Sequence, residues 1–76
     1  MITSSDIGEA VRGARKGMGL RQDELAAAAG VGLRFLVELE RGKPTVQLGR
    51  TLSVIAAAGL DLQLVTRQPA SDEPAP

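Results

Sequence analysis

The chain has 76 residues, and its nine basic and nine acidic side chains give a formal net charge of zero. A chain of this length forms one domain at most, and a domain this small buries only about 60% of the surface that its unfolded chain exposes. The absence of cysteine and histidine excludes disulfides and the usual zinc sites, so we expect neither a metal nor a cofactor.

The composition also bears on location and on the kind of core. No run of about 18 or more apolar residues occurs, so no membrane span is predicted. Residues 1–6 lack the charged-then-apolar pattern of a signal peptide, and we expect a cytoplasmic protein with no membrane contact. One phenylalanine and no tyrosine or tryptophan leave aliphatic side chains to build the core, which suits close-packed helices helped by oligomerisation.

The first predicted helix runs for about three turns after residues 3–5, whose hydroxyl groups are suited to cap it. Asp6 and Glu9 place negative charge in its first turn, where the helix dipole favours it. Gly17 and Gly19 end it. One apolar stripe runs along the helix, formed by Ile7, Ala10, Val11, Ala14 and Met18.

Residues 21–40 predict two short helices joined by a turn, from about 21–29 and 33–41. Gly30 ends the first, because the left-handed conformation at a helix end costs glycine least. Two short helices with a turn of three or four residues form a helix-turn-helix unit. Its apolar positions are Leu25, Ala26 and Ala29 in the first helix, and Leu36 and Leu39 in the second.

A fourth helix is predicted after Thr45, which is a plausible N-cap, and it ends at Gly59. Its apolar residues at helical spacing are Leu48, Leu52, Ile55 and Ala56. We therefore assign residues 1–59 to one helical domain.

Residues 60–67 change to an alternating pattern, which favours a strand. A lone strand has no partner within a helical chain, and the simplest remedy is an antiparallel ribbon with the same strand of a second copy. The alternative is an irregular tail in which Leu60 and Leu62 pack back on the helices. The predicted dimerisation residues are Leu60, Leu62, Leu64 and Val65.

The last segment, residues 68–76, is acidic and rich in proline, and we expect it to be disordered. It would serve as a solubilising tail or a partner-binding segment. The middle of the chain has the opposite charge, because residues 10–50 contain eight basic and four acidic side chains, a local charge of +4. Such a block permits a surface that faces phosphates, but the charge alone favours a solvated helical surface.

The helix-turn-helix region resembles the Cro/CI-type (XRE) family over about residues 5–60. The resemblance rests on residues 20–26, Gly30-Val31, Leu36 and residues 39–42. It implies an all-α, compact four-helix DNA-binding domain of the lambda-repressor-like type, with the motif at about residues 21–40. The continuation through residues 42–48 and the strand that follows look most like HipB-type antitoxins, in which a C-terminal strand pairs across a homodimer.

The resemblance also implies roles for single residues. Gln22 matches the position that holds a DNA phosphate and nearby side chains of the recognition helix, and Arg15 and Glu40 match a structural pair that bridges the first and third helices. The third helix would lie in the major groove, where Arg34 is suited to bind guanine O6 and N7. The implied readout face comprises Gly32, Leu33, Arg34, Val37 and Glu38. Phosphate contacts are implied for Arg21, Arg41 and Lys43.

Three departures from the family pattern stand out. Arg21 replaces the Ser or Thr that often caps the second helix, and Gly32 replaces a similar cap on the third. The recognition surface is also unusually apolar. Phe35 would pack under the motif or lie against DNA or a partner, and we favour packing.

An enzyme is not expected, because there is no histidine or cysteine, no phosphate-binding glycine loop, and no carboxylate pair in a shielded setting. No small-molecule substrate is expected either. The resemblance implies a sequence-specific repressor of double-stranded operator DNA. As a HipB-like antitoxin of a type II toxin-antitoxin operon, it would bind a HipA-like kinase toxin and autoregulate. The alternatives are a stand-alone phage-type or restriction-controller repressor, or a protein-interaction module that does not bind DNA.

Overall fold

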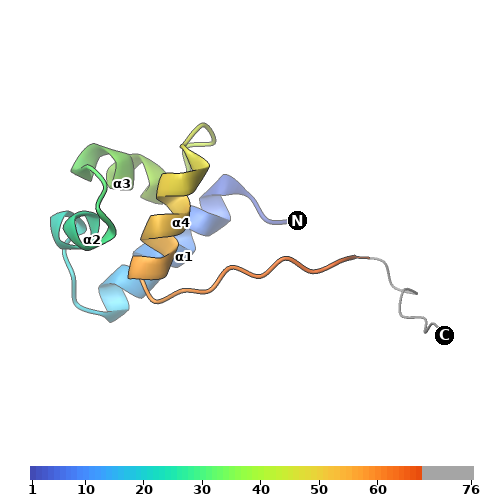
Figure 1. Ribbon diagram of the computed structural model, residues 1–76, viewed down its shortest axis with the longest axis horizontal. Coiled ribbons are helices and arrows are strands. Elements are labelled where there is room, and N and C mark those ends of the chain that lie inside the picture. Colours follow the sequence, from blue (N-terminus) through green and yellow to red (C-terminus); the bar gives the residue numbers. More distant parts are fainter. Residues whose placement is uncertain (68–76) are drawn as a thin grey trace.

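The computed structural model describes residues 1–67, which form four helices and an extended C-terminal segment (Figure 1). The two helices of the predicted motif pack against each other, the first helix packs against the third, and the second packs against the fourth. The predicted acidic tail, residues 68–76, lies outside the described residues. The helices are α1 (Ser4–Gly17), α2 (Gln22–Ala29), α3 (Leu33–Glu40) and α4 (Leu48–Ala57).

The first helix begins with a reciprocal cap. The Asp6 N–H donates to the Thr3 hydroxyl oxygen at 3.1 Å, and the Thr3 N–H donates to the Asp6 carboxylate at 2.9 Å. This arrangement satisfies two backbone donors that a helix start otherwise leaves free. Of the three hydroxyl residues suited to cap α1, Thr3 is therefore the one used.

The start of α2 is capped from one side only. Arg21 occupies the N-cap, and its side chain forms no capping bond to the helix backbone, whereas its N–H donates to the Glu24 carboxylate at 2.8 Å. Gly30 follows α2 with φ 72°, the left-handed conformation that the sequence predicted there. The tight turn brings Val31 into contact with the core.

The predicted N-cap of α4 is wrong. The helix begins at Leu48, and its N-cap is Gln47, whose side-chain oxygen accepts the Arg50 N–H at 3.0 Å. Thr45 lies in the preceding link. Val46 packs against the core from that link, so the chain crosses the core surface before it turns into the helix.

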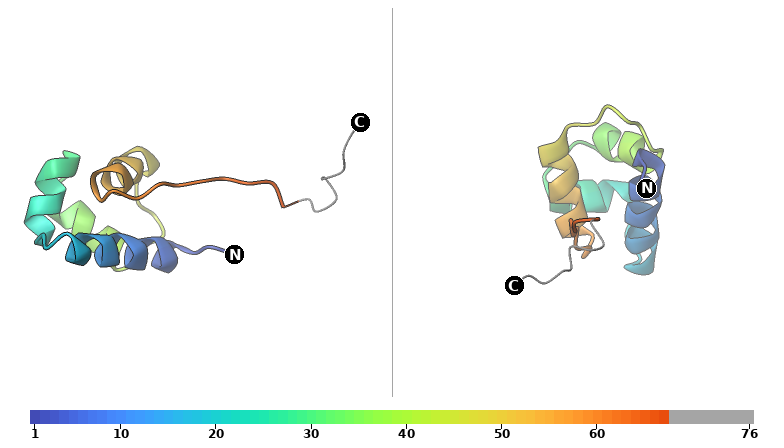
Figure 2. Two further views of the ribbon diagram at one scale, coloured as in Figure 1. Left: turned by 90° about the horizontal axis from the view of Figure 1, so that it is seen from below. Right: turned by 90° about the vertical axis from the view of Figure 1, so that its right-hand side faces the viewer.

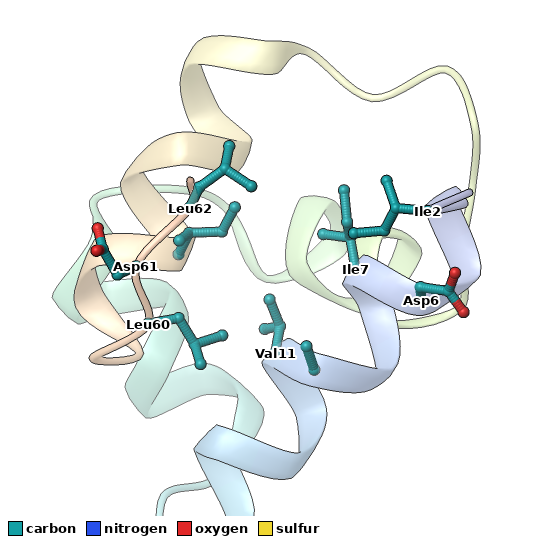
Figure 3. Close-up of a pocket in the computed structure, with 9 residues that line it drawn as sticks. Ile2, Asp6, Ile7, Val11, Leu60, Asp61 and Leu62 are labelled. Atoms are coloured by element: carbon teal, nitrogen blue, oxygen red, sulfur yellow. The ribbon is translucent and has the colours of Figure 1, made fainter. Parts of the chain in front are cut away.

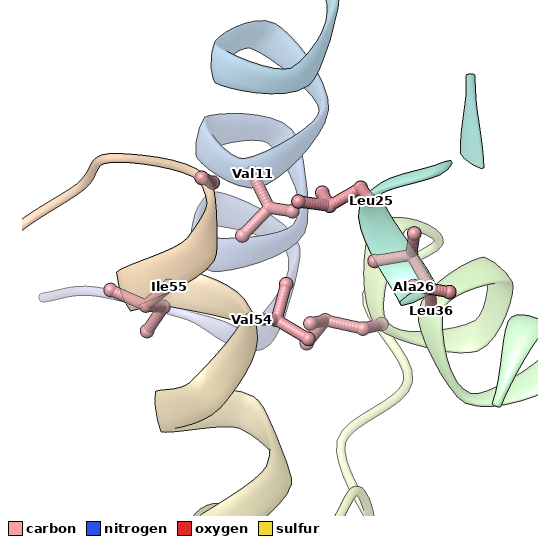
Figure 4. Close-up of a cluster of buried hydrophobic side chains, with 8 residues drawn as sticks. Val11, Leu25, Ala26, Leu36, Val54 and Ile55 are labelled. Atoms are coloured by element: carbon pink, nitrogen blue, oxygen red, sulfur yellow. The ribbon is translucent and has the colours of Figure 1, made fainter. Parts of the chain in front are cut away.

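Each helix contributes one large, fully buried side chain to the centre of the core (Figure 4). Burying an aliphatic side chain of this size stabilises the fold by about 1.5–3 kcal/mol. Phe35 is half-buried against the same cluster, which agrees with packing under the motif. The four central side chains are Val11, Leu25, Leu36 and Val54.

The buried face of α4 differs from its predicted apolar stripe. Leu48 is 67% exposed, and Leu52 and Ala56 are also exposed, so Ile55 is the one residue of that stripe in the core. The core-facing side includes Thr51, whose hydroxyl donates to the Gln47 carbonyl at 3.0 Å. A buried hydroxyl is tolerated when it forms a hydrogen bond, so this face of α4 can pack on the core while Leu48 and Leu52 face solvent.

Residues 60–67 are extended, but no strand is assigned to them (Figure 2). Leu60 packs against the helices, and its N–H donates to the Ile55 carbonyl at 3.0 Å. The segment then leaves the helices, and Leu64 is 89% exposed. Residues 1–59 offer this segment no neighbouring strand, because they form helices and links.

At Gly8, α1 lies close against the backbone at the end of α3. A Cβ atom placed there would lie 2.8 Å from the Glu40 carbonyl oxygen and would meet the Leu39 carbonyl oxygen more closely still. Both obstacles are backbone atoms, which cannot rotate away. Gly13, on the same helix, has open space where its Cβ would be.

We predict that Gly8→Ala lowers the free energy of unfolding by about 1–3 kcal/mol, because α1 and α3 must separate to admit the methyl group. Gly13→Ala is the matched control and raises it by about 0.5–1 kcal/mol, since alanine favours a helix. Urea unfolding of both variants at one protein concentration measures the two changes. Equal stabilisation by the two alanines would contradict the close approach.

Candidate nucleic-acid interface

Three elements meet at the carboxylate of Glu40. Arg15 of α1 donates to it through two nitrogens, with Nε 2.7 Å from Oε2 and Nη2 3.0 Å from Oε1. The side chains of Arg15 and Glu40 are only 10% and 3% exposed. The third nitrogen of the guanidinium, Nη1, donates to the Leu20 carbonyl at 2.9 Å, so the link between α1 and α2 is held as well.

Gln22 joins the second helix to this pair. Its amide nitrogen donates to Glu40 Oε1 at 3.1 Å. Glu40 therefore accepts bonds from the first residue of α2 and from α1 while it ends α3. Hydrogen bonding to this carboxylate raises the pKa of Arg15 above its ordinary value, against the opposing effect of burial. The guanidinium thus stays charged.

A polar cleft of about 400 Å³ opens above this pair. Arg12 of α1 and Arg41 after α3 lie on its walls with Gln22 and Val37. Glu40 neutralises Arg15, whereas neither Arg12 nor Arg41 forms an ion pair within residues 1–67. The cleft therefore presents positive charge and an amide to any anion that enters it.

Arg12 was not among the residues predicted to contact DNA. The signal available in the sequence is its spacing from Arg15, because residues three apart lie on one face of a helix. Only the contact between α1 and the end of α3 places that face beside Gln22 and Arg41.

The predicted readout residues begin with the N-cap of α3 and continue along the helix. Gly32 occupies the N-cap without a side-chain bond, and Leu33 is exposed. The Arg34 side chain is 91% exposed, with its Nε 3.5 Å from Glu38 one turn later. Val37 is half-buried and lines the cleft.

Glu38 contacts two of the predicted DNA-binding cations. Besides Arg34, it accepts a hydrogen bond from Lys43 Nζ at 3.2 Å. This bond lowers the pKa of Glu38 below its ordinary value, chiefly through the Lys43 ammonium group. A nucleic acid that takes either cation must replace its contact with Glu38.

Arg21 is less available than its position suggests. Its guanidinium lies 3.1 Å from Asp23 and 3.6 Å from Glu24. The bond from Arg21 also lowers the pKa of Asp23. A phosphate at the start of α2 must therefore compete with two carboxylates for Arg21, whereas Arg41 has no such competitor among the described residues.

Residues 1–67 contain no group of three or more acidic side chains arranged to hold a metal ion. None of the four helices is long and apolar enough to cross a membrane.

No family model matches the chain. A curated relative from Sinorhizobium fredii (strain NBRC 101917 / NGR234), the uncharacterized HTH-type transcriptional regulator y4mF, is 54% identical over 63 residues, which are 83% of each chain. Two solved structures share the fold at 18% identity, and each match covers 90% of this chain and 96% of the other. One is described as "MDT Protein", with a TM-score of 0.79, and the other as "HipB-O4 20mer complex", with a TM-score of 0.78.

We predict that Glu40→Gln lowers the free energy of unfolding by about 3–5 kcal/mol, because it leaves the buried Arg15 charge without a counter-charge. The double replacement Arg15→Met with Glu40→Leu removes both charges and costs clearly less. Urea unfolding of the two variants at one protein concentration compares them. A double variant less stable than Glu40→Gln would show that the pair itself contributes the stability.

Proposed function

The chain belongs to the HTH-type transcriptional regulators, as an XRE-type member with a HipB-like fold, and on that premise we propose that it is a homodimeric, sequence-specific repressor of operator DNA. It is a DNA-binding regulator rather than an enzyme, and it acts on DNA in the cytoplasm. The observation that carries the proposal is the buried carboxylate of Glu40, whose bonds to Arg15 and Gln22 hold α2 and α3 together. The Arg34 side chain of α3 meanwhile stays 91% exposed.

Base readout is assigned to the N-terminal half of α3, which enters the major groove. Arg34 bonds guanine O6 and N7 through its guanidinium, and Glu38 accepts from cytosine N4. Leu33 and Val37 contact thymine methyl groups, while Gly32 lets the backbone approach the base edges. Exposure of Arg34 and Leu33 supports this assignment.

Phosphate contacts are assigned to the residues around α3 and the start of α2. One N–H of the Gln22 amide is held by Glu40, which leaves its other N–H to donate to a phosphate oxygen of the DNA backbone. Arg41 lies beside it on the cleft, Lys43 follows α3, and Arg21 contributes once its carboxylates are displaced. Such contacts set the position of the domain without specifying sequence.

Two copies are required by the proposed mode of binding. Residues 60–67 of each copy pair as an antiparallel ribbon, through a segment that includes Leu60, Leu62, Leu64 and Val65. The exposure of Leu64 and Val65 supports this pairing. Two motifs reading one face of the duplex then recognise half-sites about one helical turn apart, roughly 34–36 Å.

The protein partner in this proposal is a HipA-like kinase toxin, which makes the chain the antitoxin of an autoregulated type II operon. The resemblance of residues 42–48 and of the segment after α4 to HipB-type antitoxins supports this role. A stand-alone phage-type or restriction-controller repressor is the alternative, and a protein-interaction module without DNA binding is the third candidate.

We predict that Arg34→Ala reduces affinity for the chain's own promoter DNA by about 5- to 150-fold, with little change for unrelated DNA, because a bidentate guanine contact contributes about 1–3 kcal/mol of discrimination. Arg41→Ala is the comparator, because loss of a phosphate contact weakens both complexes and lowers the slope of log affinity against log salt by about one. Titrations on both DNAs at several salt concentrations measure these effects.

Equal losses on the two DNAs for Arg34→Ala would remove its role in reading bases. If the unchanged protein showed no salt-dependent binding to duplex DNA, the interaction-module alternative would hold instead.

The antitoxin role predicts that the gene beside this one encodes a HipA-like kinase. Co-expression of the two should yield a complex that co-elutes in gel filtration, and it should relieve the growth arrest caused by the kinase alone. The control is co-expression of the kinase with the Glu40→Gln variant, in which Arg15 has lost its counter-charge. An adjacent gene of another kind would instead favour the stand-alone repressor.

A further inference from the structure

The extended segment has two chemically different faces. Gln63 Nε2 donates to Asp61 Oδ2 at 3.2 Å, so these two side chains lie on the same side. Asp61 borders a groove between this segment and α1, but its carboxylate points away from α1 in Figure 3, whereas Leu60 and Leu62 line the groove. Extended backbone alternates its side chains, which puts Leu60, Leu62, Leu64 and Thr66 on the inner face. The outer face carries Asp61, Gln63, Val65 and Arg67.

The groove has a volume of about 150 Å³ and lies between the N-terminal half of α1 and this segment. Ile2, Ile7 and Val11 form its far wall (Figure 3). The chain covers it only as far as Leu62, because Leu64 has already left the helices and is almost fully exposed. The inner face therefore continues past the helices as an apolar edge.

The outer face ends in opposite charges six residues apart. Asp61 is exposed, and its described hydrogen-bond donor is Gln63. Arg67 is exposed at the other end and forms no ion pair within residues 1–67. A segment with a carboxylate at one end and a guanidinium at the other complements a reversed copy of itself.

We propose that a second copy of this chain pairs with residues 60–67 in one antiparallel register, with Leu64 opposite the partner's Leu64 and Asp61 opposite the partner's Arg67. This inference rests on the homodimer of the proposed function and specifies which residues meet in it. The partner is a second copy because, when two copies run antiparallel, Asp61 of each faces Arg67 of the other.

The two-fold axis and the charges together select this register. Directly opposite residues of an antiparallel pair point to the same side, so a two-fold axis places inner-face residues opposite inner-face residues. A shift that centres the axis on Gln63 puts Asp61 opposite the partner's Val65, and one centred on Val65 puts Arg67 opposite the partner's Gln63. Only the axis at Leu64 forms the Asp61–Arg67 pair, and symmetry forms it twice.

The same register places both helical domains on one side of the ribbon. Leu62 then lies opposite the partner's Thr66, and the two Leu64 side chains meet at the axis beside the open ends of both grooves. The apolar edge that one chain leaves in water becomes the centre of the interface. Exposed ion pairs contribute little affinity, so the role of Asp61 and Arg67 is to disfavour the shifted registers.

A cysteine scan tests the register, because the natural chain contains no cysteine. Leu62→Cys, Gln63→Cys, Leu64→Cys and Val65→Cys are made singly in the full chain, oxidised with diamide, and followed on non-reducing gels. A residue opposite its own copy has Cβ atoms about 4.5–5.5 Å apart, close to disulfide geometry, whereas residues two positions away are separated further. We expect Leu64→Cys to cross-link fastest.

The outcomes separate the register from the homodimer itself. Faster cross-linking at position 62, 63 or 65 would overturn this register but leave the strand-paired dimer. Absence of cross-linking at all four positions, with a dimer mass by light scattering, would place the interface elsewhere and overturn both the register and the ribbon. A monomer mass for the unchanged chain would overturn the homodimer.

Charge reversal is the second arm. Asp61→Arg places two like-charge pairs at the interface and should raise the dimer dissociation constant about three- to thirty-fold, and Arg67→Asp should do the same. The double reversal restores the pairs and should return the constant to near that of the natural chain. Asp61→Asn, the matched control, removes the attraction without creating repulsion and should have a smaller effect. A double reversal as weak as either single one would contradict the pairing.

Discussion

The buried carboxylate of Glu40 is the constraint on which the rest of the structure depends. A carboxylate removed from water must find partners for both oxygens, and here α1 supplies Arg15 while α2 supplies Gln22. The close approach at Gly8 brings α1 against the backbone that carries Glu40. The placement of α2 against α3 is thereby set by short polar bonds, together with the core cluster of Val11, Leu25, Leu36 and Val54 (Figure 4).

The ion pairs of the described residues separate the basic side chains around the motif into three groups. Arg15 is neutralised and immobilised inside, whereas Arg21, Arg34 and Lys43 contact surface carboxylates. Arg12 and Arg41 line the cleft without such a contact in residues 1–67. A chain with zero net charge thus presents a locally positive surface, because its acidic side chains are spent on particular cations or lie elsewhere.

The small core leaves several leucines exposed. Each helix supplies one central side chain, and a core of this size leaves little margin for a chain of 76 residues. Leucines nevertheless remain outside, at positions 48 and 52 of α4 and at positions 62 and 64 of the extended segment. Such groups are costly in water, and the proposed pairing with a second copy buries those of the segment.

The sequence by itself determined the features that depend on neighbours along the chain. The helical order, the left-handed Gly30 and the alternation of residues 60–67 are local, because backbone conformation and side-chain period depend on nearby residues. Family resemblance named Arg15 and Glu40 as a pair that bridges α1 and α3, and Gln22 as a residue near the side chains of α3; the bond from Gln22 to Glu40 was found in the structure. Tertiary structure alone decided which residues of α4 face the core, where α1 needs Gly8, and that Arg12 stands beside Gln22 and Arg41. It also showed that Arg21 is engaged by two carboxylates and that Gln47 caps α4 in place of Thr45. These facts depend on the distance between helices, and a pattern along one helix does not contain that distance.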